Sequence, residues 1–290
     1  MNSKAAAKQE GPLALICGGG SLPLAVADYV IKRGREVVLF PIHGAANPAD
    51  FADHPHQWVY VGQAGRFARL ANAAGCRDVV LIGALVRPAL WQLRFDLRTF
   101  MLLPRAARAF RGGDNHLLSA VGSVIEMYGF RLLGAHEVAP EILVPEGKLG
   151  RVQPSERDQA DIALGFEYLR AAGPFDVGQS VVVVNKHVLA VEAAEGTDAM
   201  LGRVTQMRAS GRVRTPARTG VLVKAPKHGQ DLRLDMPSIG PKTVEGAGLA
   251  GLAGIAVATG ATIIAEPERL VRAADRASIF VIGKSAGTAR

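Results

Sequence analysis

Carboxylates gather in one short run in the second half of the chain. Between Glu192 and Asp198, two glutamates and one aspartate fall close together around a glycine. Like charges packed into one turn raise the cost of ionising all of them, and a bound Mg²⁺ or Mn²⁺ would lower that cost because hard cations take carboxylate oxygens. The alternative is an acidic helix start, in which Thr197 caps a helix whose dipole favours Asp198. The residues alone leave both interpretations open.

A second group of charges follows an expected strand. It places three basic side chains around two aspartates: Lys224, Lys227, Arg233, Asp231 and Asp235. Basic side chains neutralise phosphate oxygens, while carboxylates hold a metal ion or orient water, so this mixture suits phosphate chemistry. The alternative is a loop of ordinary salt bridges, which contribute little to stability. His228 lies in the same stretch, and the pattern gives it no role.

A glycine-rich turn in the first half, Gly18-Gly19-Gly20-Ser21, separates an expected strand from an expected helix. Glycine lets the backbone approach a phosphate closely, and a helix N-terminus offers free N–H donors, so Gly19, Gly20 and Ser21 are candidate substrate contacts. Ser21 is also a candidate N-cap, and a tight strand-to-helix turn is the competing interpretation. The spacing is neither that of a dinucleotide fingerprint nor that of a P-loop. The second strand also ends without the acidic residue that holds a ribose, which argues against NAD.

Several enzyme classes lose support from motifs that are missing. The sequence contains no serine-hydrolase elbow, no zinc-protease helix and no Cys-x-x-Cys pair. Cys17 and Cys76 each lie in an apolar run, so we expect two buried thiols without a disulfide, as in a reducing cytoplasm.

The chain is basic, with a net charge of +8, which favours a phosphate-bearing substrate or an anionic membrane surface. Five arginines lie between Arg203 and Arg218, in what reads as an exposed loop after Arg208. No continuous Lys/Arg run is present, so we expect no nucleic-acid partner. No segment approaches the ~20 apolar residues that span a bilayer, and the N-terminus lacks a signal-peptide core. We therefore expect a cytoplasmic protein that can contact the inner membrane peripherally.

Alternating strands and helices are expected to position these residues. In the first half the expected strands are 13–17, 36–40, 78–82 and 131–134, and the expected helices are 22–33, 67–74, 97–111 and 117–128. This alternation predicts a parallel sheet with helices on its faces. In the second half we expect helices at 156–172, 198–207, 243–250 and 267–277, and strands at 180–184, 188–193, 220–225, 255–257, 262–265 and 279–282.

The fold class is therefore α/β, with two domains. Residues 1–145 should form an N-terminal Rossmann-like parallel-sheet domain, and residues 155–290 a C-terminal mixed α/β catalytic domain. Glycine and proline in 146–154 suggest a linker. A hairpin turn is expected at residues 185–186, and Thr243 is expected to cap the helix that starts there.

Several stretches, in order over nearly the whole chain, resemble a known family: Gly18–Pro23, Gly134–Glu137, Asp176–Gln179, Glu192 with Glu195–Leu201, Lys224–Lys227 and Arg233–Gly240. They are similar to the LpxI-type UDP-2,3-diacylglucosamine pyrophosphatases of lipid A biosynthesis. The resemblance implies two α/β domains and a Mg²⁺-dependent (or Mn²⁺-dependent) hydrolysis that releases UMP and 2,3-diacylglucosamine 1-phosphate (lipid X).

The resemblance also ranks the candidate site residues. It implies that Asp235 is the essential aspartate and that Gln179, Thr197 and Lys224 face the ligand, beside the glycine turn. From the two charged clusters at strand ends we add the hypothesis that Asp235, with Glu195 or Asp198 as its catalytic partner, holds Mg²⁺, with Asp198 as the second metal ligand. In the same hypothesis Lys227 and Arg233 join Lys224 as substrate contacts.

The implied partner is a UDP-linked diacylated sugar lipid, met at the inner leaflet. The sequence leaves open whether two copies form a homodimer. It also leaves three rival functions: a non-catalytic nucleotide or lipid carrier on the same fold, a dinucleotide-dependent oxidoreductase and a nucleic-acid binder.

Overall fold

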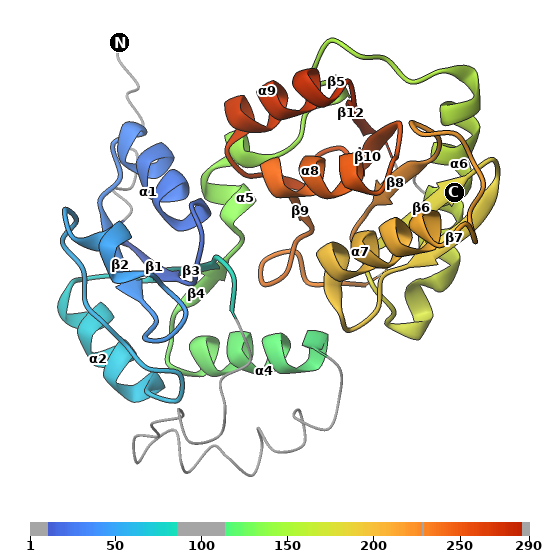
Figure 1. The fold of residues 1–290 in the computed structure, drawn as a ribbon. Coiled ribbons are helices and arrows are strands. Elements are labelled where there is room, and N and C mark those ends of the chain that lie inside the picture. The colour runs from blue at the N-terminus through green and yellow to red at the C-terminus, as the bar shows by residue number, and fades with distance from the viewer. Residues whose placement is uncertain (1–10, 86–113, 228, 286–290) are drawn as a thin grey trace, which may run out of the picture. The chain divides into compact units, whose positions relative to one another are not determined.

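The computed structural model describes residues 11–85, 114–227 and 229–285 (Figure 1). The expected helix at 97–111 and His228 lie outside these described residues. The chain divides into two compact units, Met1–Glu141 and Ile142–Arg290. Within the described ranges, no helix is long and apolar enough to cross a membrane.

The first unit is built on a four-stranded sheet in the order β2-β1-β3-β4, with all neighbours parallel. Its strands are β1 (Leu13–Cys17), β2 (Val37–Pro41), β3 (Asp78–Ile82) and β4 (Arg131–Leu133). Its helices are α1 (Leu22–Lys32), α2 (Ala64–Ala73), α4 (Asp114–Met127) and α5 (Ala135–Val138), with 3₁₀ turns at Pro48–Phe51 and Pro140–Ile142. β3 is buried along its whole length, as expected of a strand in a parallel sheet. The expected Rossmann-like parallel sheet is confirmed.

The second unit holds a six-stranded mixed sheet in the order β5-β12-β10-β8-β6-β7. The strands are β5 (Gly147–Lys148), β6 (Ser180–Val184), β7 (His187–Val191), β8 (Val221–Lys224), β10 (Gly254–Ala258) and β12 (Phe280–Lys284). A separate parallel pair joins β9 (Ser238–Ile239) to β11 (Ile263–Ile264). The helices are α6 (Glu156–Ala172), α7 (Gly196–Ala209), α8 (Pro241–Leu249) and α9 (Pro267–Ala277), with a 3₁₀ turn at Gly173–Phe175. The expected mixed α/β class is confirmed.

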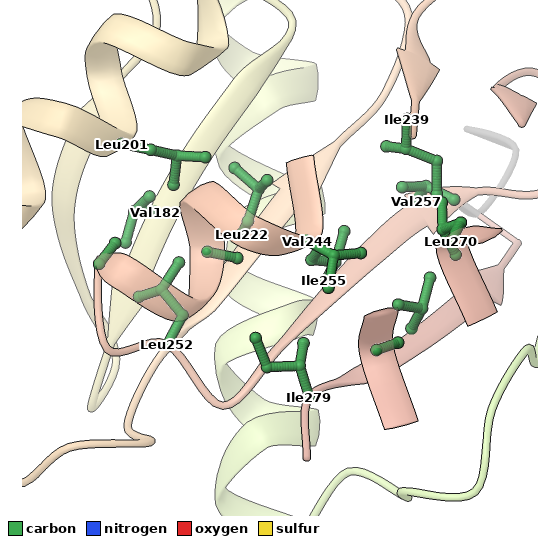
Figure 2. Close-up of a cluster of buried hydrophobic side chains, with 14 of the residues drawn as sticks. Val182, Leu201, Leu222, Ile239, Val244, Leu252, Ile255, Val257, Leu270 and Ile279 are labelled. Atoms are coloured by element: carbon green, nitrogen blue, oxygen red, sulfur yellow. The ribbon is translucent and has the colours of Figure 1, made fainter. Parts of the chain in front are cut away.

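Alternating side chains on the strands supply a core on each face of this sheet. Val182 and Val184 pack with α7, α8 and α9, whereas Val181 and Val183 pack with α6. Figure 2 shows the first of these layers, in which Leu201 and Val244 lie over the strands. The period of two along each strand thus fixes which side chains face which helices.

The turn between β6 and β7 follows its sequence. Asn185 and Lys186 both have positive φ, 51° and 61°, which is the backbone of a two-residue hairpin turn. The backbone N–H groups of both residues donate to the buried Asp161, at 3.0 and 2.6 Å. This anchor fixes the register of the hairpin against α6.

The segment 146–154, expected as a linker, lies in the second unit. β5 pairs antiparallel with β12, and the Leu149 N–H donates to the Val281 carbonyl at 2.9 Å. The Arg151 N–H donates to the Asp275 carboxylate at 2.8 Å. Glycine and proline indicated a break in regular structure here. A short edge strand can still form next to such a break, because its pairing with β12 needs only backbone N–H and carbonyl groups.

Candidate catalytic site at one edge of the second sheet

Three neighbouring strands of the second unit bring their polar ends to the same edge of the sheet. β6 runs antiparallel to both β7 and β8, with Ser180 opposite Lys224 and Val181 opposite Val191. Gln179 directly precedes β6, and Glu192 directly follows β7. The strand pairing therefore collects side chains that are far apart in sequence.

A hydrogen-bonded chain links the residues at this edge. The Lys224 ammonium donates to Thr197 Oγ1 at 2.9 Å, and that hydroxyl donates to Glu192 Oε1 at 3.0 Å. The other Glu192 oxygen accepts from the Gln179 backbone N–H at 3.1 Å, and Ser180 Oγ lies 3.3 Å from Thr197 Oγ1. The Thr197 hydroxyl thus donates to Glu192 and accepts from Lys224. Its fixed orientation in turn fixes the position of the Lys224 ammonium.

Lys224 is a buried cation, with 8% of its surface exposed. Burial lowers the pKa of its ammonium, while the carboxylates of Glu192, Asp198 and Asp235 act in the opposite direction. A buried ammonium gains more from an anion than an exposed one, because the surrounding protein screens the attraction weakly. The position therefore suits a phosphate oxygen.

Asp235 is held by two side-chain amides. Its Oδ2 atom accepts from Gln179 Nε2 at 2.9 Å and from Gln230 Nε2. Among the described residues, no hydrogen bond reaches Oδ1. Burial raises the pKa of the Asp235 carboxyl, and the charge of Lys227, the two amide donors and the charge of Lys224 offset part of that rise. The result is an oriented carboxylate with one available oxygen and a raised affinity for protons.

Lys227 and Arg233, the other two basic side chains of the cluster, have carboxylate partners of their own. Lys227 Nζ is 2.7 Å from Asp176 Oδ1, and the Arg233 Nη2 is 2.8 Å from Asp231 Oδ2. The hydrogen bond from Arg233 is the main reason why the pKa of Asp231 is lowered. Lys227 still acts electrostatically on Asp235, whereas the predicted contact of Arg233 with substrate would require its guanidinium to share Asp231.

The acidic run ahead of α7 separates into different environments. Glu195 forms an ion pair with Arg203 at 2.5 Å, on a half-exposed surface, and its predicted catalytic role stays a prediction. Asp198 is exposed in the first turn of α7 and is near enough to Lys224 to raise the pKa of that lysine. Glu195 and Asp198 were the two proposed partners of Asp235. Of these, Asp198 acts on Lys224, the lysine on which Asp235 also acts.

Neither Thr197 nor Thr243 is the N-cap of its helix, although Thr243 takes part in capping α8 from within its first turn. α7 begins at Gly196, so Thr197 lies inside the helix, and its hydroxyl bonds to Glu192 and Lys224. α8 begins at Pro241, and Thr243 sits in its first turn, where its hydroxyl accepts from the Gly240 N–H at 3.2 Å. The preference of threonine for helix N-caps does not show when its hydroxyl will instead bond to a residue on another strand, as Thr197 does with Lys224.

The carboxylates near Lys224 are the residues that could contribute to a metal site. Among the described residues, no three His, Cys, Asp or Glu side chains gather as a metal cage. Asp235 offers Oδ1, and both Asp235 and Asp198 act electrostatically on the Lys224 ammonium. Mg²⁺ is commonly bound by one or two carboxylates together with substrate phosphates and waters. The donor set fits that pattern, with Asp235 as the main protein ligand.

The glycine turn of the first unit has a structural explanation. Gly19 and Ala84 exchange backbone hydrogen bonds at 2.9 and 2.8 Å, and a Cβ at Gly18 would lie 2.6 Å from the Ala84 carbonyl oxygen. Gly20 has φ +91°, and Ser21 occupies the N-cap of α1 without a capping hydrogen bond from its side chain. Close approach of the backbone just after β3 thus accounts for Gly18, close approach of the Ala45 carbonyl for Gly19, and the positive φ for Gly20. Substrate contact by Gly19, Gly20 and Ser21 stays a prediction.

Sequence reasoning assigned no role to several residues of the site. Ser180 and Gln230 carry no motif, and Glu192 was only one member of an acidic run. Gly178 belongs here too, because a Cβ on it would lie 2.3 Å from the Glu192 carbonyl oxygen. The register of the predicted hairpin could have placed Glu192 beside Ser180.

Two domain families match the chain, one for each unit. The LpxI N-terminal domain matches residues 12–142, and the LpxI C-terminal domain matches residues 145–282. The UDP-2,3-diacylglucosamine pyrophosphatase LpxI of Caulobacter vibrioides is 40% identical over 271 residues, which cover 93% of this chain and 96% of that protein.

Proposed function

We propose, from the premise that the chain belongs to the LpxI family, that it hydrolyses the pyrophosphate bond of UDP-2,3-diacylglucosamine. The products are UMP and 2,3-diacylglucosamine 1-phosphate. The observation that supports this reaction in the chain itself is the pair formed by Asp235 and Lys224, an oriented carboxylate beside a buried ammonium.

Lys224 binds an oxygen of the pyrophosphate. Its ammonium already has three carboxylates around it, but only the Thr197 hydroxyl accepts a hydrogen bond from it among the described residues. An ammonium has three donors, so two can turn to the substrate. As the bond to the bridging oxygen breaks, negative charge grows on that oxygen, and a cation fixed in advance stabilises it.

Asp235 orients the attacking water and takes its proton. The water oxygen bonds to one phosphorus while the bond from that phosphorus to the bridging oxygen breaks. Gln179 and Gln230 hold Oδ2, so Oδ1 is the atom directed to water or metal. The raised pKa of this carboxyl makes it a stronger base than an exposed aspartate.

We also propose a dependence on Mg²⁺ or Mn²⁺, held by Asp235 with Asp198 as the second carboxylate. Such an ion, when bound, would neutralise the phosphate charge and polarise the phosphorus. Thr197 and Glu192 keep their hydrogen bonds and hold the Lys224 ammonium in position.

The substrate named for the relative carries two acyl chains, so the chain must meet a lipid surface. A cytoplasmic protein of net charge +8 would be attracted to an anionic inner leaflet. A homodimer stays a prediction.

Incubating the full chain with UDP-2,3-diacylglucosamine and Mg²⁺, with UMP measured against time, tests the proposal. The Asp235→Asn variant should lose about 100-fold or more in rate, the contribution expected of a general base. Asp53→Asn, at an exposed position of the first unit, makes the same chemical change away from the site and should retain the wild-type rate.

Two outcomes would overturn parts of the proposal. Tight binding of the UDP-linked lipid without UMP release would indicate a carrier instead of an enzyme. Full activity after EDTA would remove the metal from the mechanism while leaving the hydrolysis in place. A thermal melt of each variant separates lost chemistry from lost folding.

A further inference from the structure

The longest stretch of one-signed charge in the chain lies outside the catalytic site. No aspartate or glutamate occurs between Asp198 and Asp231, although this stretch contains all the arginines from Arg203 to Arg218. Its middle part, residues 211–218, is called the arginine loop below. It carries Arg212, Arg214 and Arg218, and the catalytic proposal uses none of them.

The arginine loop has a defined shape. Arg208, at the end of α7, donates to the carbonyls of Thr215, Pro216 and Thr219 at 3.1, 3.2 and 2.7 Å. Arg218 has φ +61°, a left-handed backbone that costs an L-residue free energy and persists only where neighbours impose it. The loop is thus folded back onto α7 by a partly buried arginine.

The three remaining arginines of the loop face solvent. Arg212, Arg214 and Arg218 are all exposed, and no ion pair with a described residue engages any of them. Concentrated, uncompensated positive charge on a fixed loop is the electrostatic complement of a polyanionic surface.

The exposed side of α7 extends this basic surface. Arg203, Gln206, Met207 and Ser210 share one helix face and line a cavity of about 390 Å³. The arginine loop also adjoins the end of α8, since the Thr219 N–H donates to the Gly251 carbonyl at 3.2 Å. Two residues earlier, Leu249 is 75% exposed. Apolar surface therefore accompanies the charge.

The arginine loop and the catalytic residues lie at opposite ends of α7. Thr197 is in the first turn of this 14-residue helix, and a helix of that length spans about 21 Å. The loop arginines consequently do not reach the pyrophosphate site. A helix lying along a flat surface would nevertheless keep Thr197 at the level of that surface.

We propose that the arginine loop and the exposed face of α7 dock on an anionic lipid bilayer. This inference rests on the proposed function, because a diacylated substrate resides in such a bilayer. The loop arginines contact lipid phosphates, and Leu249 lies against the boundary between headgroups and acyl chains. The role of these residues is to keep the chain at the membrane that holds its substrate.

The composition of the surface favours lipid over nucleic acid. The arginine loop and the exposed face of α7 contain no aromatic side chain on which a base could stack. The exposed apolar residue beside the loop gains from an acyl boundary and gains nothing from phosphodiester backbone.

Vesicle sedimentation tests the docking surface with the full chain. Wild-type protein is mixed with vesicles of pure phosphatidylcholine or of phosphatidylcholine with phosphatidylglycerol. Each basic residue near an anionic surface strengthens partitioning about fivefold. The triple variant Arg212→Gln, Arg214→Gln, Arg218→Gln should therefore bind the anionic vesicles about 100-fold more weakly than wild type, and wild type should bind neutral vesicles poorly.

The matched control removes the same charge from another helix. Arg269, Arg272 and Arg276 line a cavity between α8 and α9, and two of them form ion pairs with Glu266 and Glu268. Their triple Gln variant should keep most of the anionic binding. Equal loss in both triple variants, or equal binding of wild type to neutral vesicles, would overturn the proposal.

Two further measurements distinguish the docking surface from the proposed hydrolysis and from nucleic-acid binding. The loop variant should hydrolyse detergent-dispersed substrate at the wild-type rate, so vesicle binding without hydrolysis would refute the proposed function and support the docking surface. Release from the vesicles by a random-sequence RNA, with tighter binding to the RNA than to lipid at physiological salt, would assign the surface to nucleic acid instead.

Discussion

Removing the Gln230 amide should move the pH dependence of catalysis in a defined direction. The hydrogen bond from this amide lowers the pKa of Asp235 against the effect of burial, which raises it. In Gln230→Ala the carboxylate loses one of its two amide donors, so its pKa should rise further. Because the mechanism uses ionised Asp235, activity is present above that pKa and is lost as the pH falls through it. The acidic limb of the rate profile should therefore lie at higher pH in the variant.

The magnitude follows from the kind of hydrogen bond removed. A hydrogen bond to a charged group contributes about 1.5–3 kcal/mol, and each 1.4 kcal/mol is about tenfold in an equilibrium or a rate. At a pH on the acidic limb, kcat/KM should therefore fall about 10- to 100-fold. At a pH well above the limb, most of the activity should return, since the carboxylate is then ionised in both proteins.

The assay is UMP release measured across a series of pH values at saturating Mg²⁺. Gln206→Ala, an exposed position on α7, supplies the matched control and should reproduce the wild-type profile. A loss of the same size at every pH would show that Gln230 acts through local folding alone. An unshifted limb with full activity would refute the assignment of Asp235 as the ionising group.

Other substitutions probe the same framework. Lys224→Met should lower kcat/KM for the pyrophosphate substrate by about 100-fold or more, as measured by UMP release, because a preorganised charge contact is lost. Gly178→Ala should displace the Glu192 backbone and reduce activity, whereas Gly202→Ala, with open space around its Cα in α7, should stabilise the chain by about 0.5–1 kcal/mol in a thermal melt. Asp78→Asn should destabilise the chain by about 3 kcal/mol in denaturant titrations at neutral pH, because it breaks the buried ion pair with Arg35 and the pairing with the more exposed Arg131. Burial raises the pKa of Asp78, but hydrogen bonds and charge from those arginines lower it overall. Its contribution should therefore be present at neutral pH and be lost as the pH falls, and unchanged denaturant midpoints from pH 7 to 3 would contradict this.

The sequence predicted the bounds of a helix or strand correctly where the local pattern included the capping residues of the helix or the apolar run of the strand. α6 occupies residues 156–172 as expected, since Ser155 accepts from the Asp158 N–H and Asp158 in turn accepts from the Ser155 N–H. The valine run of β6 also has its expected bounds. By contrast, β5 is a two-residue edge strand that forms by pairing with β12, and no local pattern marks such a strand.

The candidate site was accessible from sequence only in part. Asp235 and Lys224 stand out because they belong to a mixed acidic and basic cluster that also carries the family resemblance, and the structure brings their side chains into one electrostatic environment. Gln230 does not stand out, because an amide in a loop has many ordinary uses. Local patterns left open whether Thr197 caps α7, because its partner Lys224 lies 27 residues later in the chain, on another strand.

The position of β12 has a consequence for how the chain folds during synthesis. β12 lies between β5 and β10, so the last strand of the sequence is an interior strand of the second sheet. The first sheet, in contrast, is complete once β4 has been made. The first unit can therefore fold while the ribosome is still synthesising the second, whose sheet cannot form fully before residues 280–284 are made. Until then the second unit exposes unpaired strand edges. Slow translation of the codons for β12 should consequently lengthen the exposure of the second unit to aggregation and proteolysis, and leave the first unit unaffected.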